Sequence, residues 1–359
     1  MNKATPRPAF DEERVSSALA RPRIVSLSRN LQAVSLDVMK IIPARHILHQ
    51  AWQLGRIDAG TTIVESSSGN FALGLAIVCR EMGLKLHIVG DPAIDASLRR
   101  MLCNLGAIVD IIEKPDAFGA YQRLRLERVA QVLADNRDAY WVQQYDNPAN
   151  PQAYGELAAT IVEAAGSEFD LVAAVGSGGS SVGLATALRA LDARITLTAV
   201  DTYRSILFGL PDGKRTLRGL GNSVMPKILD HTQFDQVHWM TSAQGNRAAI
   251  ELHAQHGLFC GPTSGAAHHV AAHKAATNPG RRVVFIAPDT GYRYQDTIFN
   301  EDWLRANGEY ADRSQREPFV VSHLDQVAPE QIWSCMDWHR RSLDDASWQA
   351  SSRESELTS

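Results

Sequence analysis

A short run of small residues is the clearest chemical signal in this sequence. The run follows an apolar stretch at residues 171–175 and precedes a helix-like stretch at residues 181–189. It consists of Gly176, Ser177, Gly178, Gly179 and Ser180. A glycine-rich turn at a helix N-terminus directs several backbone N–H groups at one point, where the helix dipole adds positive potential. The run therefore predicts a phosphate-binding loop, of the kind used by dinucleotides, mononucleotides and pyridoxal phosphate. A tight structural turn is the alternative.

The loop fits a nicotinamide-dinucleotide fingerprint only in part. That fingerprint needs glycine at its first, third and sixth positions, with an acidic residue about 20 residues further on. Gly176 and Gly178 fit the first two positions and Asp201 fits the acidic one, but the sixth position is Ser181. Because a side chain there hinders close packing of helix on strand, the loop favours a compact cup around one phosphate.

A second loop, rich in hydroxyl groups, also follows a strand-like run. After Glu65 the chain reads Ser66, Ser67, Ser68, Gly69, Asn70 and Phe71. Small hydroxyl residues and the first amides of a helix suit a carboxylate ligand, and Asn70 could hydrogen-bond a hydroxyl or a carbonyl. An ordinary helix cap, made by Ser68 or Asn70, is the alternative and would explain part of the pattern.

Lys40 is the lysine whose neighbours suggest chemistry. The chain has seven lysines, and this one is bracketed by Val38, Met39, Ile41 and Ile42. Removal from water lowers the pKa of a lysine and makes its amine a usable nucleophile and base. The alternative is a lysine that extends from a helix edge to solvent. A hydroxyl-rich turn at residues 261–265 includes Thr263 and opens another predicted helix, but such turns are common and have little specificity alone.

The elements that must position these residues follow an alternating pattern. Between about residues 45 and 300, β-branched runs alternate with amphipathic or alanine-rich stretches. The predicted strands are 61–65, 85–90, 108–112, 140–143, 171–175, 195–200 and 282–287, and the predicted helices include 71–82, 96–105, 120–136, 152–165 and 242–256. This alternation predicts an α/β fold with two open, twisted, mostly parallel sheets flanked by helices. Ligands of such folds bind beyond the carboxyl ends of the strands.

A change in composition near residues 147–151 predicts a domain crossing. We expect a smaller N-terminal α/β domain at residues 45–148 and a larger cofactor-binding α/β domain made of residues 1–44 and 149–310. Residues 311–359 form a C-terminal extension. Its segment 319–343 is expected to dock on the body or on a second subunit, and its polar end, residues 346–359, is expected to be disordered.

Composition excludes several classes of protein. A length of 359 residues suits two domains, and a net charge of −4 gives no reason to expect nucleic acid or an anionic membrane as a partner. No apolar run reaches the roughly 20 residues that span a bilayer, and the first residues lack the apolar core of a signal peptide, so we expect a cytoplasmic protein. The four cysteines lack paired spacing, which argues against a disulfide framework and against a bound metal.

Taken in chain order, these motifs resemble the fold type II pyridoxal phosphate enzymes, the family of cysteine synthase, cystathionine β-synthase and the tryptophan synthase β chain. Residues 67–71 match the family's Thr-Ser-Gly-Asn-Thr loop, and residues 176–180 match its phosphate loop. The resemblance covers about residues 15 to 305. Segments 200–209 and 288–294 are most similar to the siderophore-pathway branch that makes N-(2-amino-2-carboxyethyl)-L-glutamate.

The resemblance implies a role for each candidate residue. Lys40 would carry pyridoxal 5′-phosphate and, once released, would act as the base for the Cα proton. Asn70 would hydrogen-bond the hydroxyl of the cofactor ring, and Thr263 would face its pyridine nitrogen. The phosphate would lie on Gly176, Ser177, Gly178, Gly179 and Ser180. The substrate carboxylate would meet Ser67, Ser68, Gly69 and Gln144.

Several positions differ from the family pattern. Ile41 and Ile42 follow the lysine where the family has Asp-Arg, and Phe71 replaces a hydroxyl residue. Tyr154 begins the stretch that replaces the family's Thr-Gly-Pro-Glu, and Cys260 stands where a small apolar residue is usual.

The resemblance also implies a reaction. A serine-type donor, O-phosphoserine or O-acetylserine, would lose its leaving group to give an aminoacrylate, to which an amino acid or a thiol nucleophile adds. The protein would thus be a pyridoxal phosphate-dependent transferase of amino acid or secondary-metabolite biosynthesis, acting as a homodimer. Three alternatives stay open: a β-eliminating lyase or deaminase, a homologue that binds ligand without catalysis, and a nicotinamide dehydrogenase.

Overall fold

The computed structural model describes residues 14–115, 121–216 and 219–346, and they fall into two compact units. The smaller unit comprises Met1–Arg21 and Leu36–Ala153, and the larger comprises Pro22–Ser35 and Tyr154–Ser359. Residues 36–44 thus group with the smaller unit, and the C-terminal segment groups with the larger one. The domain division expected from the sequence stays a prediction, since compactness does not show which part folds independently. Each unit is described by itself below.

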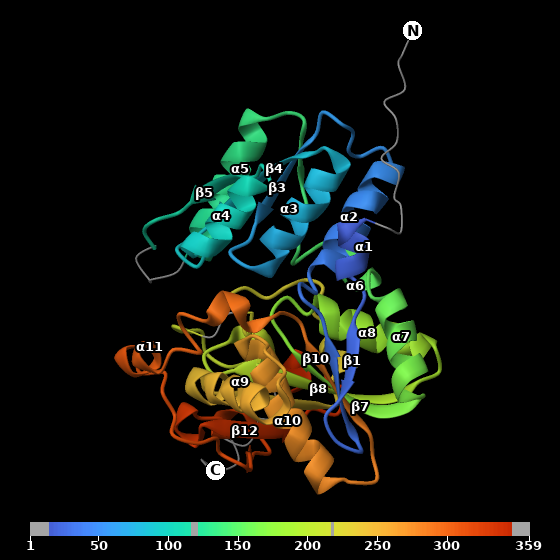
Figure 1. Ribbon diagram of the computed structural model, residues 1–359, viewed down its shortest axis with the longest axis vertical. Coiled ribbons are helices and arrows are strands. Elements are labelled where there is room, and N and C mark those ends of the chain that lie inside the picture. Colours follow the sequence, from blue (N-terminus) through green and yellow to red (C-terminus); the bar gives the residue numbers. More distant parts are fainter. Residues whose placement is uncertain (1–13, 116–120, 217–218, 347–359) are drawn as a thin grey trace, which may run out of the picture. The chain divides into compact units, whose positions relative to one another are not determined.

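The smaller unit is built on a four-stranded sheet in which every pair is parallel. The strand order is β5-β4-β3-β6. The strands are β3 (Thr62–Ser66), β4 (Lys85–Gly90), β5 (Ile108–Ile111) and β6 (Ala139–Trp141). The flanking helices are α1 (Val15–Leu19), α2 (Ile41–Gln53), α3 (Asn70–Met82), α4 (Ala96–Asn104), α5 (Gln122–Asp135) and α6 (Ala149–Gln152) (Figure 1). Every residue of the central strand β3 is buried, as expected of a strand covered on both faces.

The larger unit contains an eight-stranded sheet in the order β1-β2-β10-β7-β8-β9-β12-β11. From β2 to β9 neighbouring strands are parallel, whereas β1 and β12 join at either side as antiparallel strands. The strands are β1 (Arg23–Ser26), β2 (Leu31–Ser35), β7 (Glu168–Ala174), β8 (Arg194–Thr202), β9 (Gln236–Met240), β10 (Val283–Ala287), β11 (Phe319–Val320) and β12 (Trp333–Asp337). Its α-helices are α7 (Gly155–Ala165), α8 (Gly179–Ala190), α9 (Ser242–His256), α10 (Pro262–Thr277) and α11 (Glu301–Ala306) (Figure 1).

Short 3-10 segments complete the described part of the larger unit. They are η1 (Ile206–Phe208), η2 (His231–Gln233), η3 (Gly291–Tyr294), η4 (Leu324–Gln326) and η5 (Pro329–Gln331). None of the helices within the described ranges combines the length and the apolar character that crossing a bilayer requires.

The predicted α/β fold is confirmed, and each predicted strand is present with small shifts at its ends. The helix predicted for residues 152–165 is divided into α6 and α7 at Ala153 and Tyr154. The sequence did not predict β1, β2, β9, β11 and β12. Of the two docking alternatives for segment 319–343, the described residues show docking on the body, because β12 pairs with β9. Of residues 346–359, expected to be disordered, Ala346 is described and is buried, and residues 347–359 lie outside the described residues.

Candidate active site

The predicted phosphate loop connects β7 to α8 and depends on two glycines. Gly178 has a φ of 81°, in the left-handed region that favours glycine, and a Cβ there would lie 2.8 Å from a methyl carbon of Leu229. A Cβ on Gly176 would lie 3.0 Å from the carbonyl oxygen of Gly219. Since α8 begins at Gly179, two residues earlier than expected, its first N–H groups lie within the loop and lack carbonyl partners inside the helix. The loop is thus a backbone cradle of the kind that a phosphate requires.

The structure brings Thr263 close to this loop through the backbone of Gly219. The carbonyl of Gly219 faces Gly176, and a Cβ on Gly219 would lie 3.2 Å from the methyl group of Thr263. Thr263 is buried in the first turn of α10. The side chain of Asn222 also donates a hydrogen bond to the carbonyl of Gly176, at 3.4 Å. Segment 219–222 was missed from the sequence, although its Gly-Leu-Gly-Asn pattern is a signal for close backbone approach.

Tyr154 provides a buried polar atom beside the cradle. Its side chain is fully buried, and its hydroxyl lies close to Ser180 with no other hydrogen-bond partner in the described part of the chain. Burial raises the pKa of the phenol, so the group stays a neutral hydroxyl. A buried hydroxyl with spare hydrogen-bonding capacity beside a glycine cradle fits a bound phosphate. By contrast, burial raises the pKa of the Cys260 thiol to about 12, which removes its thiolate at neutral pH.

Lys40 stands directly before α2, and α3 packs closely against its backbone. Its side chain is half-buried, and loss of water lowers the pKa of the amine to about 8. A Cβ on Gly74 of α3 would lie 2.9 Å from the Lys40 carbonyl oxygen and 3.0 Å from the Ile41 nitrogen. The absence of a side chain at Gly74 therefore sets the distance between the two helices at the lysine. A lowered pKa agrees with the predicted role as a nucleophile and base.

The hydroxyl-rich loop joins β3 to α3. The N-cap residue of α3 is Gly69, which makes no side-chain hydrogen bond to the helix. A cap by Ser68 or Asn70 therefore does not explain the pattern. Ser67 Oγ accepts a hydrogen bond from the Ala72 N–H at 3.2 Å. Ser68 Oγ accepts from the Asp91 N–H at 3.1 Å. The loop therefore precedes a helix N-terminus, where the helix dipole favours a negatively charged group such as a carboxylate.

Gln144 lies against this loop, and its expected contact with a substrate carboxylate stays a prediction. Its side chain is buried and donates from Nε2 to the Ser66 carbonyl at 3.0 Å. Its backbone N–H donates to Glu65 Oε2 at 3.1 Å, and its carbonyl accepts from Asn150 Nδ2 at 2.7 Å. Gln143, just before it, has a φ of 59°, which turns the chain at the end of β6. Glu65 was not assigned a role from the sequence, because a single acid between Val64 and Ser66 gives no sign of the partners it will meet.

Arg125 of α5 is a further charged group at the loop that the sequence did not reveal. It is buried, and its Nη1 donates to Ser68 Oγ at 2.8 Å and lies 3.1 Å from Asp91 Oδ2. No sequence signal separated Arg125 from its neighbours Arg123 and Arg128, because the helix carries all three. The guanidinium is paired with the Asp91 carboxylate, so Arg125 links Ser68 to Asp91 and holds the loop in place.

The predicted residues thus form two groups, one in each unit. In the smaller unit Gln144 lies against the loop before α3, and the backbone of Lys40 packs against Gly74 in the second turn of α3. The larger unit brings together residues 176–180 and Thr263 around the starts of α8 and α10. Within the described ranges, no three His, Cys, Asp or Glu side chains are arranged to hold a metal ion.

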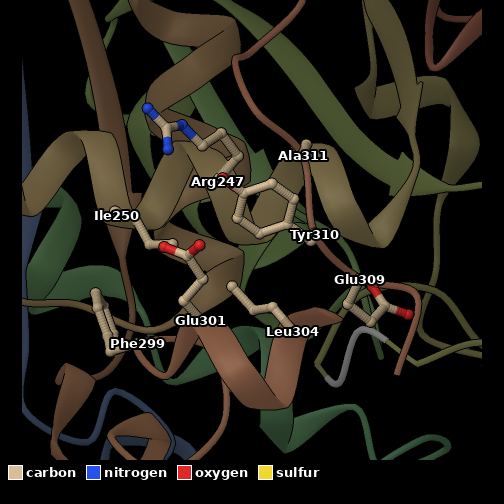
Figure 2. Close-up of a pocket in the computed structure, with 8 residues that line it drawn as sticks. All are labelled: Arg247, Ile250, Phe299, Glu301, Leu304, Glu309, Tyr310 and Ala311. Carbon is tan, nitrogen blue, oxygen red and sulfur yellow. The ribbon is translucent and has the colours of Figure 1, made fainter. Parts of the chain in front are cut away.

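The larger unit also contains a cavity of about 160 Å³ that none of the predicted site residues lines (Figure 2). Its charged groups are already paired. Arg247 Nε lies 2.8 Å from Glu251, and Glu309 accepts hydrogen bonds from Thr216 and from Asn246. Figure 2 shows Arg247, Glu301 and Glu309 pointing in different directions. The cavity therefore does not compete with the two groups as the candidate active site.

Comparison with known proteins agrees with this geometry. Residues 34–289 match the family model for "Pyridoxal-phosphate dependent enzyme". The chain is 34% identical over 268 residues to an N-(2-amino-2-carboxyethyl)-L-glutamate synthase of Cupriavidus metallidurans, covering 73% of this chain and 79% of the relative. It is 35% identical over 269 residues to a protein of the same name from Ralstonia nicotianae, covering 73% and 78%.

A solved structure shows the same fold. The O-acetylserine dependent cystathionine beta-synthase from Helicobacter pylori is 25% identical and superposes with a TM-score of 0.72, covering 79% of this chain and 97% of that one. The cradle, the buried hydroxyl beside it and the desolvated lysine all fit the cofactor of this family. The chain therefore belongs to the family of pyridoxal-phosphate dependent enzymes, with pyridoxal 5′-phosphate as its cofactor.

Proposed function

We propose that this enzyme catalyses β-replacement on a serine-type donor, O-phosphoserine or O-acetylserine, and joins the amine of an amino acid such as glutamate to the resulting three-carbon unit. The observation that carries the proposal is that Thr263, whose side chain has a neutral hydroxyl and no carboxylate, lies beside Gly219 near the cradle. If Thr263 faces the pyridine nitrogen, as the resemblance implies, its hydroxyl would not keep that nitrogen protonated as an aspartate would. The weaker electron sink favours prompt loss of a β leaving group over a long-lived carbanion.

The residues of the chain divide the work as follows. Bound pyridoxal phosphate supplies the electron sink that loosens the Cα proton and the β leaving group of the donor. Residues 176–180 would hold the phosphate, and Asn70 would hold the ring hydroxyl. Ser67, Ser68, Gly69 and Gln144 hold the donor carboxylate. Lys40, with a pKa of about 8, takes up the Cα proton, since part of its amine is neutral near physiological pH.

The names of the relatives support an amino acid acceptor over sulfide. Both relatives described above carry the name N-(2-amino-2-carboxyethyl)-L-glutamate synthase. We also propose that the enzyme is cytoplasmic and that it forms a homodimer. Gel filtration with light scattering tests the dimer.

The reaction is tested by mass spectrometry of the products. The holoenzyme is given O-phosphoserine or O-acetylserine with glutamate, other amino acids, or sulfide. We expect a new adduct of donor carbons and acceptor, with the largest yield for an amino acid acceptor. Keto acid formed at the same rate with and without acceptor would instead identify the β-eliminating alternative.

Replacement of Lys40 tests the residue assignment. We expect Lys40→Ala to lose the absorbance band of lysine-bound cofactor and to lose at least about 10³-fold in turnover, as is usual when a covalent and proton-transferring group is removed. The exposed Lys85 of β4 provides the matched control, and Lys85→Ala should keep both properties. A Lys40→Ala protein with normal turnover would contradict the assignment.

A further inference from the structure

We propose that Glu65 is a positioning residue that holds Gln144 against the hydroxyl-rich loop, and so sets how tightly the site binds the carboxylate of an amino acid. Glu65 is the last but one residue of β3, and only 1% of its surface is exposed. The inference rests on the proposed function, because it assumes that this loop receives an amino acid carboxylate.

Each carboxylate oxygen of Glu65 accepts a different backbone N–H. Oε1 accepts from Ser66 at 2.7 Å, and Oε2 accepts from Gln144 at 3.1 Å. The two donors are 78 residues apart in the chain, and they belong to the two segments proposed to grip the substrate. A single buried side chain therefore ties both segments to one point.

Glu65 acts where the main-chain pairing of the sheet stops. The register between β3 and β6 ends at Val64 and Trp141, where the Val142 N–H still donates to the Val64 carbonyl at 3.2 Å, and Gln143 then leaves the strand with its positive φ. Beyond that point, the Glu65 side chain and the bond from Gln144 Nε2 to the Ser66 carbonyl are the links between the two segments. Asn150 Nδ2 donates a hydrogen bond to the backbone carbonyl of Gln144 and so provides a further anchor for this residue.

A carboxylate suits this task better than any neutral side chain. Only a carboxylate presents two acceptor oxygens without a donor, whereas a glutamine would turn an NH₂ group toward one of the two N–H donors. Burial opposes the charge and raises the pKa of Glu65 to about 7, while the two backbone N–H bonds, the nearby Trp141 side chain and the charge of Arg125 on α5 act in the other direction. Its partner across the sheet, Ile88 of β4, is apolar. Retention of an acid in so unfavourable a setting fits a positioning role.

The test compares amino acid binding by holoenzyme carrying Glu65→Gln with wild type and with Glu163→Gln. Glu163, on the exposed side of α7, is the matched control for the same chemical change. Binding of L-serine is followed by the absorbance of the bound cofactor. We expect Glu65→Gln to weaken serine binding about tenfold above pH 7, the usual effect of losing one hydrogen bond to a charged group. Cofactor affinity and the Glu163→Gln protein should stay unchanged.

The pH dependence separates positioning from a general structural effect. As pH falls through about 7, Glu65 of the wild type takes up a proton and also loses one of its two acceptors. The ratio of the serine Kd of Glu65→Gln to that of wild type should therefore approach one near pH 6, and reach its full value near pH 8. The free amino acid and other groups of the protein also change protonation over this pH range. They do so for both wild type and Glu65→Gln, so their effects cancel in the ratio of the two Kd values.

A ratio that stays constant with pH, or a ratio of one throughout, would overturn the proposal. If Glu65→Gln does not fold, Asn150→Ala removes the donor to the Gln144 carbonyl and must also weaken serine binding; unchanged binding would count against the proposal. Because serine binding is measured without turnover, the absence of β-replacement product alone would overturn the proposed reaction and leave the role of Glu65 standing.

Discussion

The surroundings of Lys40 determine its chemistry, because loss of water around the side chain lowers the pKa of the amine. We expect the amine of Lys40 in the cofactor-free protein to react with an amine-specific acylating reagent with an apparent pKa of about 8. Competitive labelling followed by mass spectrometry measures this value, with the exposed Lys85 as the internal reference. A labelling profile of Lys40 that rises only near pH 10.5, the ordinary value, would show that the amine is solvated.

The individual residues of the site differ in how far the sequence predicts them. Gly176 and Gly178 are predictable because small residues at a strand-to-helix turn have few other uses. Glu65 and Arg125 are not, because their partners lie 79 and 57 residues away in the chain. A lone acid in an apolar strand or one arginine among several carries no sign of its partner until the strands and α5 are placed.

At the scale of elements, the contact between α2 and α3 fixes the lysine. Gly74→Ala adds a Cβ about 3 Å from backbone atoms of Lys40 and Ile41, which cannot move as a side chain would. Alanine in a helix interior normally stabilises relative to glycine by about 1 kcal/mol. Here we expect a loss of about 1–3 kcal/mol in the free energy of unfolding, and about tenfold weaker cofactor binding.

Chemical unfolding and titration with pyridoxal phosphate measure the two effects of Gly74→Ala. Gly155→Ala is the control, because Gly155 begins α7 and no atom lies within 4 Å of a Cβ placed there. Equal behaviour of the two variants would mean that α2 shifts without consequence for Lys40.

The sequence predicts strands in the middle of the parallel sheet better than strands near its edges. The strand at residues 171–175 was predicted because it is a continuous apolar run, as buried parallel strands are. By contrast, β9 contains Gln236 and His238, and β12 contains Ser334 and Asp337, so neither shows the usual apolar signature. Their pairing depends on contacts between residues about 100 positions apart, which local patterns do not encode.

At the scale of the larger unit, the C-terminal segment completes the sheet. Trp333 of β12 is fully buried in the same core cluster as Val172 of β7 and Phe285 of β10. The segment expected to be an extension is therefore part of the core of its unit. Removal of such a tryptophan usually costs about 3–5 kcal/mol of stability, so the strand is integral to the fold.

One hydrogen bond makes this attachment depend on pH. Trp333 Nε1 donates to His238 Nδ1 at 3.0 Å, which requires that this nitrogen of His238 carry no proton. Burial, with Lys274, His273 and His269 nearby, holds the pKa of His238 well below 6.5. Because the folded protein binds this proton more weakly than the unfolded chain, the contribution of His238 to stability is complete above pH 6.5 and is lost as pH falls below it.

We expect the free energy of unfolding of the wild type to fall by about 1.4 kcal/mol per pH unit below 6.5 from this histidine alone. His238→Asn places an amide oxygen where Nδ1 accepts the bond, and asparagine does not titrate. The difference between the two proteins in unfolding free energy should therefore change with that slope between about pH 6.5 and 5, because the other buried histidines contribute equally to both. Parallel pH curves for wild type and His238→Asn would show that His238 is not the group that couples β12 to pH.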